Sequence, residues 1–251
     1  DCSSCENGVF HVEIMGFNLR KCLQLLRKSN PTFLEMVRSP LVYANDNLGI
    51  MDSIRTELNV YFSQKTLSFH YINVAKQNFV DYLRNKKLVN HKKYLYILLT
   101  LFRVLYMKLK SRELGETTHL ESGMELMDVF PPLNYLELCD ALRQSGIIKQ
   151  QYESDLQYLI DRKRRECGQW DREEPMPLMY TWIEEMRRET KQYADDVLAT
   201  RKRYYDTLDA NQVQFYTQKL TDIFLVALNK FAQIDAILPY ESTTATTKEN
   251  N

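Results

Sequence analysis

The run from residue 94 to residue 109 constrains the fold most strongly, because it is apolar on nearly every side of a helix. Only Thr100, Arg103 and Lys108 interrupt it. A helix that is apolar all round has to be buried among other elements, and this run is shorter than the ~20 apolar residues that cross a bilayer. It therefore predicts the central helix of a helical core, and we expect no membrane partner.

One edge of this predicted helix carries polar side chains. The edge consists of Lys93, Tyr96, Thr100 and Arg103. Spacings of three, seven and ten residues from the first member keep all of them within about a quarter-turn of one another. A lysine and an arginine on the edge of an otherwise apolar helix suit an anion, and phosphate is the usual one. The edge therefore predicts a phosphate-binding surface.

The preceding residues, 63–84, predict an amphipathic helix with two distinct faces. Its apolar face contains Leu67, Tyr71, Val74, Phe79 and Leu83, and its polar stripe contains His70, Asn73, Gln77 and Arg84. Two interpretations of His70 stay open. Its ring faces a ligand together with the polar stripe, or it hydrogen-bonds to a neighbouring helix, as polar groups inside proteins commonly do.

The composition favours a mainly α protein of the cytoplasm. Seven glycines and seven prolines in 251 residues indicate few tight turns. The formal net charge is zero, so no global field indicates nucleic acid or an anionic membrane. Five cysteines without a disulfide-rich pattern suit a reducing compartment. Cys2 and Cys5 have a zinc-like spacing but no second pair completes a site, so we expect free thiols there.

Four regions are expected along the chain. Residues 1–17 form a disordered start and a strand near residues 10–15, and residues 18–168 form a helical region in which Asn18 caps the first helix and Pro31 begins the second. Residues 169–239 contain two long amphipathic helices, predicted at 177–203 and 208–234 and joined as an antiparallel hairpin. Residues 240–251 form a polar, disordered tail. The hairpin offers a surface for a protein partner.

Four short motifs carry a resemblance to a known family. They read N-L-R-K-C-L-Q-L-L-R-K-S-N-P at 18–31, R-S-P-L-V-Y at 38–43, F-S-Q-K-T-L-S-F-H-Y at 62–71 and K-K-Y-L-Y at 92–96. In this order and spacing the chain resembles the predicted nucleotidyltransferases of the DNA polymerase beta superfamily, and more narrowly the branch associated with RNA repair. The resemblance implies the helical bundle region of a nucleotidyltransferase, with a residual edge strand near residues 10–15.

The resemblance also implies a reaction and its participants. The full enzyme would transfer a nucleotidyl group from a nucleoside triphosphate to a hydroxyl of RNA, tRNA or a small molecule, with magnesium as cofactor. Glu13, followed by Gly16 and Phe17, occupies the position of a family carboxylate and is the expected catalytic and metal-binding residue. The residues expected to bind the nucleotide are Ser63, Lys65, His70, Tyr71, Lys93, Tyr96 and Arg103.

The chain departs from the family in two places. It contains no Gly-Ser turn followed by an Asp-x-Asp or Asp-x-Glu pair, and the adjacent Asp195 and Asp196 lie in a helical segment where their side chains point about 100° apart. The family also places an arginine and a proline where this chain has Leu99 and Thr100. We expect Arg103, one turn later, to reach the same volume as the family arginine.

Two functions therefore stay open. In the first, the chain is the C-terminal part of a longer nucleotidyltransferase and supplies its helical nucleotide-positioning region, and the start at Asp1 instead of methionine favours this expectation. In the second, it is a catalytically inactive helical module that binds partners. The missing acidic pair leaves enzymatic activity itself undecided at this point.

Overall fold

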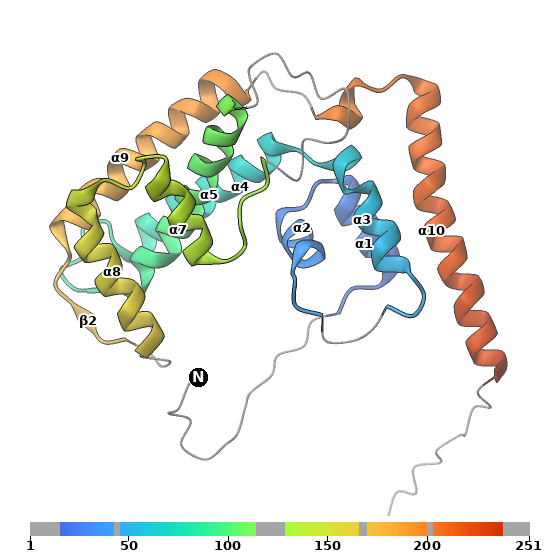
Figure 1. The fold of residues 1–251 in the computed structure, drawn as a ribbon, viewed down its shortest axis with the longest axis horizontal. Coiled ribbons are helices and arrows are strands. Elements are labelled where there is room, and N and C mark those ends of the chain that lie inside the picture. Colours follow the sequence, from blue (N-terminus) through green and yellow to red (C-terminus); the bar gives the residue numbers. More distant parts are fainter. Residues whose placement is uncertain (1–15, 43–45, 114–128, 166–169, 200–202, 238–251) are drawn as a thin grey trace, which may run out of the picture.

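The computed structural model describes residues 16–42, 46–113, 129–165, 170–199 and 203–237. The fold is mainly α, as the sequence predicted (Figure 1). The helices are α1 (Leu19–Arg27), α2 (Pro31–Arg38), α3 (Ile50–Tyr61), α4 (Gln64–Tyr82), α5 (Lys92–Glu113), α7 (Tyr135–Gln144), α8 (Gln150–Arg165), α9 (Pro177–Tyr193) and α10 (Ala210–Ile237), with the short helical turns η1 (Ala194–Leu198) and η2 (Tyr204–Thr207). The strands β1 (Val89–Asn90) and β2 (Arg172–Glu173) pair antiparallel.

Local sequence signals explain where several helices begin. The Asn18 side chain accepts a hydrogen bond from the Lys21 amide at 2.8 Å and caps α1, as predicted. Pro31 is the first residue of α2, where its missing N–H costs nothing. Ser63 caps α4, because its hydroxyl accepts a hydrogen bond from the Thr66 amide at 3.1 Å.

Helix α5 is the buried centre of the fold, as its apolar run predicted. It packs against α4, α7, α8 and α9 and takes part in two hydrophobic clusters. Leu101 and Leu105 belong to the first cluster, together with α7, α8 and α9, whereas Val104 and Met107 belong to the second, together with α1, α2 and α3. Figure 1 shows α8 and α9 on the left of the molecule and α1 to α3 on the right.

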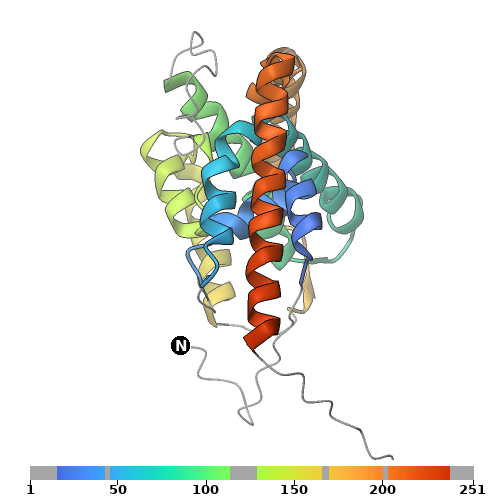
Figure 2. The same ribbon diagram turned by 90° about the vertical axis from the view of Figure 1, so that its right-hand side faces the viewer.

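The two C-terminal helices differ from the predicted hairpin. Helix α9 packs on α4, α5 and α8, whereas α10 packs on α1 and α3. Figure 1 shows α10 along the right-hand edge of the molecule. Figure 2, which views the molecule from that side, shows α10 in front of α1 and α3. The physical reason is burial: the apolar face of α9 is already covered by the first cluster, so the apolar face of α10 finds its partner in the second.

Several predicted features lie outside the described residues. These are the disordered start with the strand near residues 10–15, and the tail 240–251. The two-residue pairing of β1 with β2 was not predicted, because neither segment has the alternating pattern of a strand. Among the helices that the structure describes, none combines the length and apolar character needed to cross a membrane.

Candidate functional site

A pocket opens where α4 ends and α5 begins, and its volume is about 540 Å³. Its wall combines the last turn of α4, the connection to β1, the first turn of α5 and the segment that contains β2. The lining residues are Asp81, Tyr82, Lys86, Leu88, Val89, Asn90, Lys92, Lys93, Tyr96, Trp170 and Arg172. The volume falls in the range of ~300–1,000 Å³ that is typical of small-molecule sites.

The pocket is strongly cationic. Among the described lining residues, Lys86, Lys92, Lys93 and Arg172 face a single carboxylate, that of Asp81. The Asp81 carboxylate accepts hydrogen bonds from the Gln77 side-chain amide at 2.9 and 2.8 Å. Within the described residues, three of the four cations, Lys86, Lys93 and Arg172, form no ion pair. Converging cations without carboxylate partners raise the local concentration of anions.

Two tyrosine rings stand beside these cations. The Lys93 ammonium nitrogen lies 3.8 Å from the centre of the Tyr82 ring and 5.5 Å from the centre of the Tyr96 ring. Both rings are partly open to solvent, Tyr82 at 43% and Tyr96 at 44%. The pocket therefore offers positive charge for an anion and aromatic faces for a planar group.

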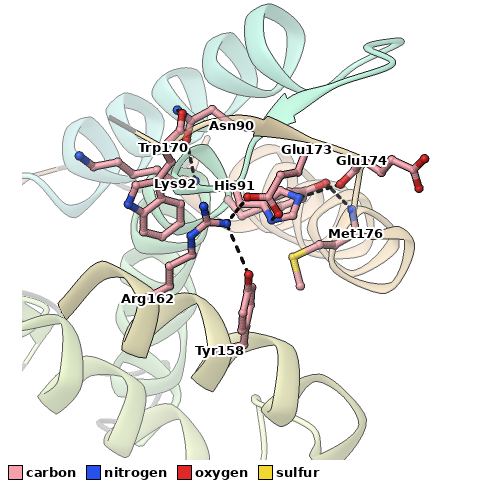
Figure 3. Close-up of polar contacts among 10 residues, drawn as sticks. Asn90, His91, Lys92, Tyr158, Arg162, Trp170, Glu173, Glu174 and Met176 are labelled. Atoms are coloured by element: carbon pink, nitrogen blue, oxygen red, sulfur yellow. Dashed lines mark hydrogen bonds and ion pairs between the residues drawn. The ribbon is translucent and has the colours of Figure 1, made fainter. Parts of the chain in front are cut away.

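Hydrogen bonds from Asn90 hold the outer wall against the first turn of α5 (Figure 3). The Asn90 side-chain amide donates to the Trp170 carbonyl at 2.9 Å, and its side-chain oxygen accepts from the Lys92 amide at 2.9 Å. The Arg162 guanidinium stacks on the Trp170 ring at 4.6 Å and also pairs with Glu173. The wall is thus tied to both α5 and α8.

His91, the residue after Asn90, also holds this wall of the pocket in place. Its Nε2 lies 2.7 Å from the Glu174 carbonyl oxygen, and because a carbonyl only accepts, Nε2 carries the proton. The Tyr94 hydroxyl accepts a hydrogen bond from the Met176 amide at 3.1 Å. Since His91 and Tyr94 are both buried, these contacts fix the wall as part of the core.

Arg103 lies in a second polar cluster, away from the pocket. Its Nη1 donates to Glu35 Oε1 of α2 at 2.9 Å, and the Tyr71 hydroxyl donates to the same oxygen at 2.6 Å. The His70 ring lies 5.7 Å from the Tyr71 ring. Burial lowers the pKa of His70, while the Glu35 carboxylate acts in the opposite direction. The cluster joins α2, α4 and α5 through the shared Glu35 carboxylate, while the buried Arg103 Nε has no hydrogen-bond partner within the described residues.

Ser63 and Lys65 lie at a third place, the N-terminus of α4. Ser63 is 6% exposed, and its amide donates to the Ser29 hydroxyl at 2.8 Å while its own hydroxyl caps α4. The Lys65 ammonium donates to the Ala199 carbonyl at 2.6 Å, just beyond η1. Both residues therefore have partners inside the described chain.

The structure brings together only two of the predicted nucleotide-binding residues, Lys93 and Tyr96, in the pocket. Arg103 does not line this pocket, because ten residues of helix separate it from Lys93 by about 15 Å. Glu13 lies outside the described residues. The sequence did not predict Trp170 and Arg172 as site residues, because no local pattern marks them. Arg172 reaches the pocket through the pairing of β2 with β1, and Trp170 is held there by the hydrogen bond from Asn90.

Magnesium, which the family resemblance implies, finds no donor set in the described helices. Within the part of the chain that the structure describes, no three His, Cys, Asp or Glu side chains gather into a metal-binding group. Magnesium needs several oxygen ligands in a near-octahedral arrangement. Asp81 is the single carboxylate among the described residues that line the pocket, so these residues do not fit a resident magnesium ion.

Comparison with known proteins gives two matches. Residues 7–214 match the sequence model of RlaP, the RNA repair pathway DNA polymerase beta family. The chain is also similar to the uncharacterized protein YcgL of Bacillus subtilis strain 168, with 28% identity over 193 residues. That similarity covers 76% of this chain and 64% of the relative, so the chain spans less than two thirds of the relative's length. No solved structure matches the chain.

Proposed function

The chain belongs to the RNA repair pathway DNA polymerase beta family, and from this premise we propose that it is the helical, nucleotide-positioning region of a nucleotidyltransferase. The reaction we propose is transfer of a nucleotidyl group from a nucleoside triphosphate to a hydroxyl of RNA or tRNA. The family's description, which places it in an RNA repair pathway, supports this acceptor.

One observation carries the proposal: cations that form no ion pair within the described chain share one pocket with open tyrosine rings. Lys93 and Tyr96 come from the K-K-Y-L-Y motif, and Lys86 and Arg172 add positive charge beside them. A triphosphate carries several negative charges, and charge-assisted hydrogen bonds from lysine and arginine bind it strongly. A base is planar and stacks on aromatic faces such as that of Tyr82. The pocket thus offers cations for the triphosphate and aromatic rings for the base.

The described residues bind and orient, and we assign no bond-making step to them. Lys93 and Arg172 hold the triphosphate, while Tyr82 and Tyr96 fix the base. Holding the nucleotide and the acceptor in the correct relative orientation lowers the barrier of a transfer reaction, because the loss of translational and rotational freedom has already occurred on binding. Glu13 remains the proposed catalytic carboxylate and metal ligand of this chain.

Lys93→Ala tests the proposal directly. We expect ATP binding, in the presence of magnesium, to weaken by about 1.5–3 kcal/mol, the range for a hydrogen bond to a charged group. The melting temperature without ligand should stay close to that of the parent protein, because Lys93 has no ion pair within the described residues. Isothermal titration calorimetry and thermal unfolding measure the two quantities on the same variant.

Lys76→Ala is the matched control for this experiment. Lys76 is an exposed lysine of α4 that does not line the pocket, so its loss changes the net charge equally without touching the site. A parent protein that none of the four ribonucleoside triphosphates stabilises against heat would overturn the proposal, since a ligand that binds the native state must raise its stability. Equal ATP affinities of Lys93→Ala and Lys76→Ala would overturn it as well.

A second candidate function is a helical module that works by binding a protein. The apolar side chains left open on α10 favour it, because exposed apolar patches commonly mark interaction sites. They are Phe215, Leu225, Val226 and Leu228, each about half exposed. The ATP titration separates this candidate from the first, because a module that works only through a protein partner gives no nucleotide binding that depends on Lys93.

A further inference from the structure

The basic end of α8 approaches the pocket from outside. Its last residues are Arg162, Lys163, Arg164 and Arg165, which stand at the C-terminus of the helix. Lys163 lies beside Lys92 of α5, a lining residue of the pocket. The pKa of Lys163 is lowered first by burial and then by the neighbouring Lys92 ammonium. Two like charges from different helices are therefore held next to each other.

A second contact makes the end of α8 continuous with the pocket wall. Arg162 stacks on Trp170, itself a lining residue of the pocket, and Figure 3 shows the Arg162 guanidinium next to the Trp170 ring. We call the resulting surface the basic ridge; it consists of Lys92 of α5 together with Lys163 and Arg165, which flank Arg162 on α8. The ridge begins at the rim of the pocket and continues along the end of α8.

Ordinary structural roles explain only part of this charge. Basic residues at a helix C-terminus stabilise the helix dipole modestly, and Arg164 pairs with Asp161 at 3.7 Å. Lys163, Arg165 and Arg172 form no ion pair within the described residues. The helix dipole also gives no reason for Lys92 of α5 to lie against Lys163, because like charges repel. An anion bound beside Lys163 would lower that repulsion.

An open aromatic ring accompanies the cations on α8. Tyr158 is 44% exposed, and its hydroxyl accepts a hydrogen bond from Arg162 Nη1 at 3.4 Å. Figure 3 shows its ring on α8 below Arg162. Cations that follow a backbone, together with rings on which bases stack, are the combination found in proteins that bind single-stranded nucleic acid.

We propose that the basic ridge docks the phosphodiester backbone of a single-stranded RNA, the acceptor strand of the proposed reaction. The inference rests on the proposed function, since it places the acceptor next to the nucleotide pocket. Lys163 and Arg165 contact phosphates, Lys92 contacts a phosphate at the rim of the pocket, and Tyr158 stacks on a base. Unpaired bases are required for such stacking, which favours a single strand over a duplex.

Binding of a short fluorescein-labelled single-stranded RNA, measured by fluorescence anisotropy with EDTA and no nucleotide, tests the ridge. We expect Lys163→Glu to raise the Kd about tenfold or more, the effect of removing one charge-assisted hydrogen bond. The slope of log K against log salt should become shallower by roughly 0.7 for each phosphate that the variant no longer neutralises. Arg165→Glu is the second variant and should act in the same direction.

Arg188→Glu is the matched control, because it makes the same change of net charge elsewhere. Arg188 is exposed on α9 and forms no ion pair within the described residues. Equal RNA affinities of Lys163→Glu, Arg165→Glu and Arg188→Glu would overturn the proposal that the basic ridge binds RNA. Equally tight binding of a poly-glutamate peptide would also overturn it, since the surface would then be a general polyanion site.

ATP binding by the same variants separates this inference from the proposed function. Lys163 does not line the pocket, so Lys163→Glu should weaken ATP binding far less than Lys93→Ala does. Loss of RNA binding with ATP binding retained supports the ridge. ATP binding that depends on Lys93, with RNA binding unchanged by Lys163→Glu, leaves the proposed function standing and overturns the ridge. Loss of RNA binding in a protein that never binds ATP supports the ridge and overturns the nucleotide site.

Discussion

Lys93 and Arg103 occupy the same edge of α5, yet their side chains meet opposite surroundings. Lys93 lies over the Tyr82 ring at the mouth of a pocket and has no ion pair within the described residues. Arg103 is 8% exposed and pairs with Glu35, beneath α2. A cation outside any ion pair remains available to a ligand, whereas the partly buried pair of Arg103 with Glu35 stabilises the fold. For these two residues, the presence or absence of an ion-pair partner determines whether the side chain stabilises the fold or remains available to a ligand.

Arg103→Ala is expected to destabilise the protein without weakening nucleotide binding. The change leaves the Glu35 carboxylate with the Tyr71 hydroxyl and removes a hydrogen bond to a charged group, which costs about 1.5–3 kcal/mol. Urea unfolding measures the loss of unfolding free energy. Arg164→Ala is the control, since Arg164 pairs with Asp161 on the surface, where such pairs are worth only about 0–1 kcal/mol.

The opposite pattern in Arg103→Ala would contradict this assignment. Unchanged urea stability combined with lost ATP binding would mean that Arg103 reaches the nucleotide, as the family resemblance implies. A double variant, Arg103→Met with Glu35→Leu, sharpens the test. Replacing both members of an ion pair that is largely removed from water by apolar groups is often neutral, so the double variant should recover most of the stability.

The N-terminus of α4 shows how one element depends on its two flanking contacts. Ser63 caps the helix, and Lys65 in its first turn ties it to the Ala199 carbonyl. The Ser63 amide is in turn bonded to Ser29, which follows α1. This helix end is therefore bound to both the N-terminal and the C-terminal parts of the described chain. Free N–H groups for a phosphate are correspondingly reduced.

Ser63→Ala should destabilise the protein by about 1 kcal/mol, the typical cost of losing a helix cap. The reason is that the Thr66 amide, in the first turn of α4, has no intrahelical carbonyl to bond and relies on the Ser63 hydroxyl. Chemical unfolding measures the change, and Ser63→Thr, which keeps a hydroxyl, should lose less. A stability unchanged in Ser63→Ala, with ATP binding lost, would show that the hydroxyl contacts the nucleotide instead.

The whole molecule is organised around one helix that two clusters share. Helix α5 gives Leu101 and Leu105 to the first cluster and Val104 and Met107 to the second. Trp182 stacks on Tyr152 at 4.4 Å inside the first cluster. Unfolding of α5 exposes the apolar side chains of both clusters at once, so the two clusters should unfold together.

We therefore expect a single cooperative unfolding transition. Both tryptophans, Trp170 and Trp182, lie in the first cluster, so their fluorescence reports on that cluster alone. Far-ultraviolet circular dichroism reports on all helices. Coincident urea transitions by the two probes would confirm one cooperative unit. A fluorescence transition separated from the circular dichroism transition would show that the clusters unfold independently.

Helix positions were largely predictable, because caps and periodicity act over a few residues. Asn18 and Pro31 begin their helices as the sequence predicted, and the apolar run of α5 is buried. The packing of α10 was not predictable in the same way. An amphipathic pattern shows that one face must be covered, but it does not identify the surface that covers it, and here α1 and α3 do so instead of α9.

The sequence by itself determined a mainly α fold, a buried α5 and a polar edge on that helix, because each follows from the spacing of neighbouring side chains. Only the tertiary structure decided which members of the edge share a site. Arg172 joins Lys93 through the pairing of β2 with β1, and Trp170 through the hydrogen bond from Asn90. Arg103 instead pairs with Glu35 of α2. Partner choice over such separations depends on how whole elements pack, and no local spacing encodes it.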